Sequence, residues 1–413
     1  MSALKGAKEP DAIPSLSASV ILIAPLQERT LDGYDYRVLL LKRHTKSSTF
    51  VSAHVFPGGH VDPIDSSNVW DPLYPDEKDA RIRHLKLCAA RECFEECGIL
   101  LEESNGGKGK EIWAGVSEED RRMWRDKVHG NGHSFFDLFE YLSASGTTSK
   151  PSLSKLQYRA NWITPRMNSR RFDTHFFVSV LPPTFVPATT SNAPLISDHL
   201  ASADAKETVS ADWLTPAEAI RRTLSHTKKL QALLGDAKLS SPPTGDSDDS
   251  IILFPPQFYL LAELADHKSY ATLLDDTDPT RIRPRAVRAF EPQLKGVKTD
   301  HGDVWPATVL PGDPEHTATS ALLEALGLSD MRKERRHRTF IVMPPRVPGK
   351  KLPPGFTVVG MCETQHPYQF VARIDYKYAL SGCRRKGMAD VLGPGWEDMT
   401  QGDVGQGPAA AKL

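Results

Sequence analysis

Hydrophobic and polar positions alternate in short blocks along the N-terminal half of the chain. Apolar runs of strand length are separated by polar turns, such as the one around Asp32-Gly33. A long helix is expected over residues 79–97, because its apolar positions recur every three or four residues and Gly98 stops it. The remaining elements predicted here are two helices, at Ser117 to Val128 and Phe135 to Leu142, and five strands, at Val20 to Ala24, Tyr36 to Leu41, Arg159 to Ile163, Thr174 to Leu181 and Thr208 to Leu214.

The pattern becomes weaker after residue 214. Residues 215–224 predict a helix, since Thr215 and Glu218 have the spacing of a capping box, and a second helix is expected from Pro255 through Ala265. From about residue 270 the chain is rich in proline and charge, with isolated strand candidates at Thr339 to Met343 and Phe370 to Ile374. Composition predicts a linker or surface loop at 237–250 and an unstructured Gly-rich segment at 391–410.

Length, charge and cysteine content narrow the class of protein. The chain has 413 residues, and its 51 Lys and Arg nearly balance its 52 Asp and Glu. This balance argues against a protein held to nucleic acid by overall positive charge. Five cysteines without a CxxC pair argue against a disulfide framework and a structural zinc site. The longest apolar runs have strand length and no secretory signal is recognisable, so a soluble intracellular protein without membrane insertion is expected.

The helix expected at 79–97 carries the candidate chemistry. At 100° per residue, Leu87 and Phe94 share an apolar face, and three glutamates, Glu92, Glu95 and Glu96, cluster on the opposite face. Carboxylates crowded on one turn repel each other, and a cation between them removes that repulsion. Oxygen-rich sites of this kind suit Mg²⁺ or Mn²⁺. The alternative for a bare glutamate triplet is a solvated acidic face.

The residues around the triplet resemble a known motif. The run Arg91-Glu92-Cys93-Phe94-Glu95-Glu96-Cys97-Gly98-Ile99 is similar to the second half of the Nudix box, R-E-U-x-E-E-x-G-U, in which U is a bulky apolar residue. Gly59 and Asp65 resemble its first half, with Asp65 in place of the expected glutamate and an insertion of 18 residues before Arg91. The role of Asp65 is therefore open. The resemblance implies an α/β fold, a Nudix α/β/α sandwich with a mixed sheet, here enlarged by insertions and a C-terminal extension.

The resemblance also implies roles for individual residues. Glu92, Glu95 and Glu96 would ligate Mg²⁺ or Mn²⁺, with the Gly59 carbonyl completing the metal shell, and Arg91 would orient a glutamate. A metal-activated water would then attack one phosphorus of a diphosphate. The general base is expected to be a box glutamate or an acid from a later loop, and the candidates there are Glu207 and Asp204, each with the alternative of a plain surface acid.

The branch of the family with the greatest resemblance includes peroxisomal coenzyme A diphosphatases. The segments that carry this resemblance are Asn161 to Pro165, Arg171 to Phe177, Asp212 to Pro216 and Leu253 to Gln257. The C-terminal tripeptide Ala411-Lys412-Leu413 resembles a peroxisomal address, which predicts recognition by the peroxisomal import receptor and localisation in the peroxisomal matrix.

Three functions stay open at this point. The first is cleavage of coenzyme A or acyl-CoA to 3′,5′-ADP and an (acyl-)phosphopantetheine, with extra phosphates held by Lys42, Arg43, Arg170 and Arg171. Only part of a coenzyme A pattern is present before the box, which keeps NADH, ADP-ribose or another nucleoside diphosphate derivative as an alternative substrate. The third is a catalytically weak Nudix module that binds a partner.

The expected domain organisation follows from these boundaries. The C-terminal extension is expected either to cap the substrate cleft or to form a homodimer contact, and the sequence leaves both open. The divisions are a mobile arm at 1–14, a Nudix hydrolase domain at 15–265 with inserts at 66–78 and 103–156, the C-terminal extension at 266–392 and a flexible tail at 393–413.

Overall fold

The structure is a computed structural model of the whole chain. It describes residues 13–44, 53–104, 112–143, 148–182 apart from 167 and 169, 208–223, 251–273 apart from 266, and 291–298, 304–310, 313, 315–317, 320, 337–342 and 357–363. Several predicted features lie outside the described residues: most of the arm at 1–14, the linker at 237–250, the acids Asp204 and Glu207, the strand at Phe370 to Ile374 and the tail with Ala411, Lys412 and Leu413.

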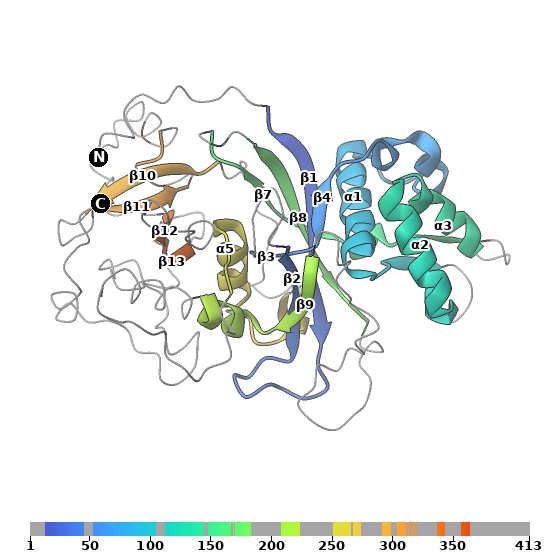
Figure 1. Cartoon of the computed structure of the whole chain (residues 1–413), viewed down its shortest axis with the longest axis horizontal. Coiled ribbons are helices and arrows are strands. Elements are labelled where there is room, and N and C mark those ends of the chain that lie inside the picture. The colour runs from blue at the N-terminus through green and yellow to red at the C-terminus, as the bar shows by residue number, and fades with distance from the viewer. Residues whose placement is uncertain are drawn as a thin grey trace.

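A mixed seven-stranded sheet forms the centre of the molecule (Figure 1). Five strands follow the order β3-β2-β1-β8-β7, β4 pairs with β1, and β9 pairs with β2. Strand β1 runs parallel to β8, and the other pairs are antiparallel. The bounds are β1 Ser15–Pro25, β2 Tyr36–Arg43, β3 His54–Val55, β4 Gly58–His60, β7 Gln157–Ile163, β8 Phe172–Val180 and β9 Thr208–Leu214. All five strands predicted before residue 215 are therefore confirmed, four of them within two residues at each end, whereas β1 begins five residues before the predicted Val20.

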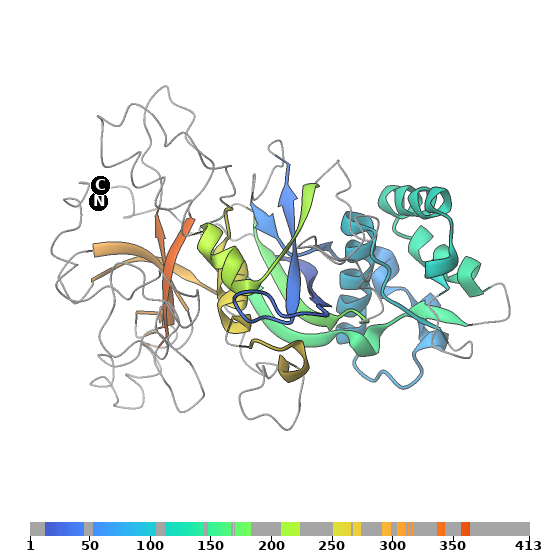
Figure 2. The ribbon, with the colours of Figure 1, turned by 90° about the horizontal axis from the view of Figure 1, so that it is seen from below.

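Helices cover both faces of this sheet. Successive side chains of β1 point to opposite faces, so that Val20 and Leu22 pack under helix α1 (Ala80–Cys97), while Ile21 and Ile23 pack toward helix α5 (Pro255–Leu264). Residues 216–223 form a further helix, which contributes to the same core as α5. The result is the α/β/α sandwich that the sequence predicts. Figure 2, turned by 90°, shows the sheet between α1 and α5.

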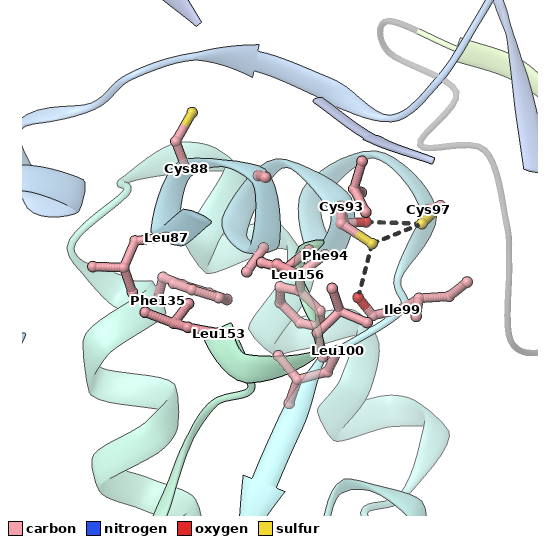
Figure 3. Close-up of a cluster of buried hydrophobic side chains, with 14 of the residues drawn as sticks. Leu87, Cys88, Cys93, Phe94, Cys97, Ile99, Leu100, Phe135, Leu153 and Leu156 are labelled. Atoms are coloured by element: carbon pink, nitrogen blue, oxygen red, sulfur yellow. Dashed lines mark hydrogen bonds between the residues drawn. The ribbon is translucent and has the colours of Figure 1, made fainter. Parts of the chain in front are cut away.

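The two inserts form an additional layer outside α1. Their hydrophobic side chains join the core on that face of the sheet, and Figure 3 shows Phe135, Leu153 and Leu156 against Leu87 and Phe94 of α1. The elements are η2 Pro63–Ser66, η3 Asn68–Leu73, β5 Glu102–Ser104, η4 Trp113–Gly115, α2 Glu118–Gly130, α3 Ser134–Ser143, β6 Ser149–Pro151 and η5 Leu153–Lys155. Both helices predicted within the second insert are confirmed as α2 and α3.

A second sheet lies in the C-terminal extension, beyond α5 (Figure 1). Its four antiparallel strands are β10 Gln293–Lys298, β11 Val304–Val309, β12 His337–Val342 and β13 Thr357–Glu363, and the short helix α6 Tyr270–Leu273 precedes it. The prediction of isolated strands was wrong here, since only β12 was expected among these four. The sequences of β10 (QLKGVK) and β11 (VWPATV) lack a clean apolar alternation, and Pro306 argues against a strand. Within the described ranges, no helix is long and apolar enough to cross a membrane.

Candidate active site

Helix α1 presents its acidic residues in its last two turns. It begins at the Asp79 cap, whose carboxylate accepts a hydrogen bond from the Ile82 amide at 3.1 Å, and ends at Gly98 with a left-handed φ of 76°. Leu87 and Phe94 hold the helix against the insert layer. Glu95 and Glu96 are themselves buried, so the face that carries them is not the solvated acidic face of the alternative interpretation.

The Gly58-Gly59 segment of β4 lies directly against these carboxylates. The Gly58 amide donates a hydrogen bond to Glu96 Oε2 at 2.9 Å. A Cβ atom at Gly59 would lie 2.5 Å from the carboxyl group of Glu92, so only glycine permits this approach. The two glutamates at i and i+4 of the helix thus share a small space with the backbone of β4.

Arg91 connects the acidic groups. Its guanidinium donates to both oxygens of Asp65 at 2.9 Å, to Glu95 Oε1 at 2.7 Å and to the His60 carbonyl at 2.8 Å, and Glu92 Oε1 lies 3.1 Å away. Arg91 and Asp65 are both buried, which makes this bidentate pair a fixed support for the neighbouring glutamates.

Asp65 reaches Arg91 despite the long insertion between them. The short helix η2 holds Asp65 in a capping box, in which the Asp62 side chain accepts from the Ile64 amide and Asp65 Oδ2 accepts from the Asp62 amide at 2.8 Å. The inserted residues continue into the outer layer after Asp65 has been placed. The structure thus assigns Asp65 a contact that the sequence left open: it orients Arg91.

The electrostatic environment favours a cation. Burial raises the pKa of Glu92 to about 8, and burial also raises the pKa values of Glu95 and Asp65, although Arg91 opposes each shift. Burial alone would lower the pKa of Arg91, but the hydrogen bonds to Asp65 and the charge of Glu92 raise it, so this side chain stays charged. Three carboxylates, those of Asp65, Glu92 and Glu95, therefore surround Arg91, and Arg43 lies 4.0 Å from the carboxylate of Glu96 as a further positive group.

A divalent cation fits this donor set, with one adjustment. The carboxylates of Glu92 and Glu96 and the space beside Gly59 provide the hard oxygen ligands that Mg²⁺ and Mn²⁺ prefer. In the part of the chain that the structure describes, however, no three His, Cys, Asp or Glu side chains already converge as a metal-binding group. Glu95 points instead toward Arg91, so metal binding requires a rotation of one or more of these side chains.

The substrate-binding pair predicted on β2 is divided between the two faces of the sheet. Arg43 lies on the α1 side, where its guanidinium approaches Glu96. Lys42 precedes it on the strand and shares the alternation of Leu40, which packs toward α5. Arg43 therefore lies at the acidic cluster, and Lys42 belongs to the opposite face.

The second predicted pair precedes β8. Arg171 is buried, and its guanidinium donates to Glu291 at 2.7 Å and to the Thr164 carbonyl at 3.1 Å. These contacts connect the seven-stranded sheet to the residues just before β10, so Arg171 is already engaged in a structural ion pair. Arg170 is exposed beside it.

Two residues of the insert also reach the acidic end of α1, and no sequence pattern pointed to either of them. Arg125 Nε donates to the Glu95 carbonyl at 2.8 Å, and His129 Nδ1 lies 3.8 Å from Glu95 Oε2. Both come from α2, some 30 residues further along the chain. The predicted helix ended at Val128, so His129 lies on the helix only because α2 extends to Gly130.

Comparison with known proteins agrees with this architecture. The model of the NUDT19 Nudix domain matches residues 15–85 and 82–231. Acyl-coenzyme A diphosphatase NUDT19 of Xenopus laevis is 29% identical over 269 residues, which cover 56% of this chain and 60% of that relative, less than two thirds of its length. The Homo sapiens protein of the same name is 27% identical over 341 residues, with 72% and 77% coverage.

Among solved structures, a NUDIX hydrolase from Alicyclobacillus acidocaldarius has 18% sequence identity and a TM-score of 0.44, and the match covers 63% of this chain and 95% of that one. The family model matches more than half of the chain, and its range contains Gly59, Asp65, Arg91 and the three glutamates of the box helix. The chain therefore belongs to the family described by the NUDT19 Nudix domain.

Proposed function

We propose that the protein is a metal-dependent diphosphatase of the Nudix hydrolase type. The observation that carries this proposal is the cluster of Glu92 and Glu95 at Arg91 with Glu96 on the same helix end, closed on one side by Gly58 and Gly59. A diphosphate is strongly anionic and would be repelled by such a cluster alone. A divalent cation makes the two compatible, because it binds carboxylate and phosphate oxygens together.

Glu92 and Glu96 would hold Mg²⁺ or Mn²⁺, with Glu95 as a further ligand and the Gly59 carbonyl beside them. When bound, the cation would supply Lewis-acid activation of water and neutralise charge that develops on the bridging oxygen. The side chains of the protein position the metal ligands: Asp65 bonds Arg91, and Arg91 in turn bonds Glu95 and pairs with Glu92. Arg43, at the Glu96 side, is the best-placed cation for a phosphate oxygen.

Coenzyme A or acyl-CoA is the preferred substrate class in this proposal. The products would be 3′,5′-ADP and (acyl-)phosphopantetheine. Support comes from the two relatives named acyl-coenzyme A diphosphatase and from the match of the family model, which spans the whole acidic cluster of this chain. NADH or ADP-ribose would be cleaved by the same chemistry and is the second candidate, since the acidic cluster recognises only the diphosphate.

A substrate panel tests the proposal. The purified protein is incubated with Mg²⁺ or Mn²⁺ and with CoA, an acyl-CoA, NADH and ADP-ribose in parallel, and the products are separated by chromatography. Glu96→Gln serves as the control variant, because its side chain can still accept the Gly58 hydrogen bond but loses its charge. Turnover of CoA or acyl-CoA by the wild type alone supports the proposal. Turnover of NADH but not CoA favours the second candidate, and no turnover of any diphosphate refutes both.

A further inference from the structure

The C-terminal end of helix α1 has an unfavourable charge arrangement of its own. The last four carbonyl groups of a helix lack intrahelical partners, and this end of the helix dipole is negative. Two further negative groups, Glu95 and Glu96, lie in this last turn, and the turn contains no basic residue. Arg91 of the same helix offsets part of this charge at Glu95, and cations from other parts of the chain offset more of it.

Helix α2 of the second insert provides the first of these cations. Arg125 Nε donates to the Glu95 carbonyl at 2.8 Å, which satisfies one of the free carbonyls of the last turn. The same guanidinium lies over Gly98, where a Cβ atom would be 3.6 Å from Arg125 Nη1. Arg125 thus acts as a cap on α1 that comes from outside the helix.

His129 continues the contact one turn later on the same face of α2. Its Nδ1 atom lies 3.8 Å from Glu95 Oε2, whereas Glu95 Oε1 accepts from Arg91 at 2.7 Å. The carboxylate of Glu95 is therefore held between a residue of its own helix and a residue of the insert. Mobility of this carboxylate would be limited at both oxygens.

The insert contacts the helix α1 and the segment around Asp62 at separate points, and these contacts hold α2 in a fixed position. Phe94 of α1 contacts the rings of Trp113 and Phe135 at centroid distances of 5.3 and 6.3 Å, and Figure 3 shows Phe135 beside it. After α2, Gly132 lies so close to Asp62 that a Cβ atom would be 2.8 Å from its carboxylate. Asp62 caps the short helix that presents Asp65 to Arg91, so the same insert contacts both sides of the cluster.

We propose that Arg125 and His129 are positioning residues for Glu95, and that helix α2 of the insert is consequently a working part of the metal site. This inference rests on the proposed function only for the identity of the site. The two residues act through Glu95: Arg125 bonds the backbone of the last turn, and His129 lies 3.8 Å from Oε2, the carboxylate oxygen that Arg91 does not bond. Residues that orient a metal ligand in this way usually change metal affinity by about 10- to 100-fold when they are removed.

The test compares four variants with two matched controls in the full chain. The variants are Arg125→Ala, Arg125→Lys, His129→Ala and His129→Gln. Arg122→Ala is the control for Arg125, because Arg122 is exposed on the same helix and donates to the Glu118 carbonyl of that helix. His133→Ala is the control for His129, because His133 pairs with exposed Asp137. Mn²⁺ affinity is measured by electron paramagnetic resonance of free Mn²⁺, and kcat and KM are measured separately.

We expect both alanine variants to weaken Mn²⁺ binding by about tenfold or more and to lower kcat with little change in KM. Arg125→Lys and His129→Gln should recover part of the affinity, and the controls should match the wild type. Wild-type Mn²⁺ affinity in both alanine variants overturns the inference. If an alanine variant does not fold, the conservative variant at the same position replaces it in the test. Mn²⁺ affinity and kcat/KM equal to those of the wild type in that conservative variant also overturn the inference.

The same data separate this inference from the proposed function. Weaker Mn²⁺ binding in the variants of a protein that cleaves no diphosphate would support the positioning roles and refute the activity. Unchanged Mn²⁺ binding and kcat in the variants of an active enzyme would refute the positioning roles alone.

Discussion

Glu92→Gln should stabilise the protein in the absence of metal while it abolishes metal binding. The reason is the raised pKa of Glu92, which moves from the usual 4.5 to about 8 on burial, with Arg91 opposing the shift. A carboxyl group that holds its proton more tightly in the folded state stabilises that state at low pH. The stability is lost as the pH rises from 4.5, where the unfolded chain releases its proton, to 8, where the folded protein does.

The size of the effect follows from the interval between the two pKa values. The wild type loses up to about 3 kcal/mol of its free energy of unfolding at pH 7 and up to about 5 kcal/mol above pH 8, relative to low pH. Glutamine does not titrate, so Glu92→Gln avoids this loss. A divalent cation at 100 times its Kd would stabilise the folded wild type by about 2.7 kcal/mol and would stabilise the variant little. The advantage of Glu92→Gln should therefore nearly disappear when metal is added at pH 7.

Chemical denaturation between pH 5 and 9, with EDTA or with Mn²⁺, measures this behaviour. In EDTA, the wild type should lose stability with rising pH relative to Glu92→Gln, and Mn²⁺ should close the gap. Two results would refute the reasoning: a variant that is less stable than the wild type in EDTA at pH 8, or a stability difference that Mn²⁺ leaves unchanged.

Three further changes test other parts of the account. Gly59→Ala places a Cβ atom 2.5 Å from the Glu92 carboxyl, so kcat should fall roughly 100-fold, whereas Gly130→Ala, with nothing within 4 Å, should be neutral; equal kinetics for both would contradict the close approach of β4. Asp65→Asn removes the bidentate carboxylate of buried Arg91, which keeps Glu92 and Glu95, and should cost about 1.5–3 kcal/mol in urea unfolding. Asp71→Asn, whose partner is Arg83 and whose side chain is 54% exposed, should cost less than about 1 kcal/mol. A loss of less than 1 kcal/mol for Asp65→Asn would argue against this support of Arg91. We also propose that Ala411, Lys412 and Leu413 direct the protein to the peroxisome, so that a fluorescent fusion should change from punctate to diffuse when they are deleted, and an unchanged pattern would count against it.

Local signals were sufficient to predict the box helix and its neighbours. The Asp79 cap and Gly98 mark the two ends of α1, and the spacing of its apolar residues determines which side faces the core. Strand alternation alone also predicts that Lys42 and Arg43 point to opposite faces of the sheet, because consecutive residues of a strand do so. The pair was nevertheless predicted to act together, since charge alone does not distinguish the two faces.

The other features depend on contacts between distant segments. Asp65 meets Arg91 across 26 positions, and Arg125 meets Glu95 across 30, so neither pair has a local pattern. The C-terminal sheet was missed for a different reason: β10 and β11 are polar or interrupted by Pro306 and gain their structure from pairing with each other. These are the places where tertiary context outweighs intrinsic propensity.

The most direct test of the central claim is the identity of the products formed from an acyl-CoA. Wild-type protein and Glu96→Gln are each incubated with the substrate and Mg²⁺ or Mn²⁺, with and without excess EDTA, and the products are identified by mass spectrometry. The account predicts 3′,5′-ADP and acyl-phosphopantetheine, formed only by the wild type and only with metal. Release of free CoA by thioester cleavage, or the same diphosphate products in EDTA or with Glu96→Gln, would contradict it.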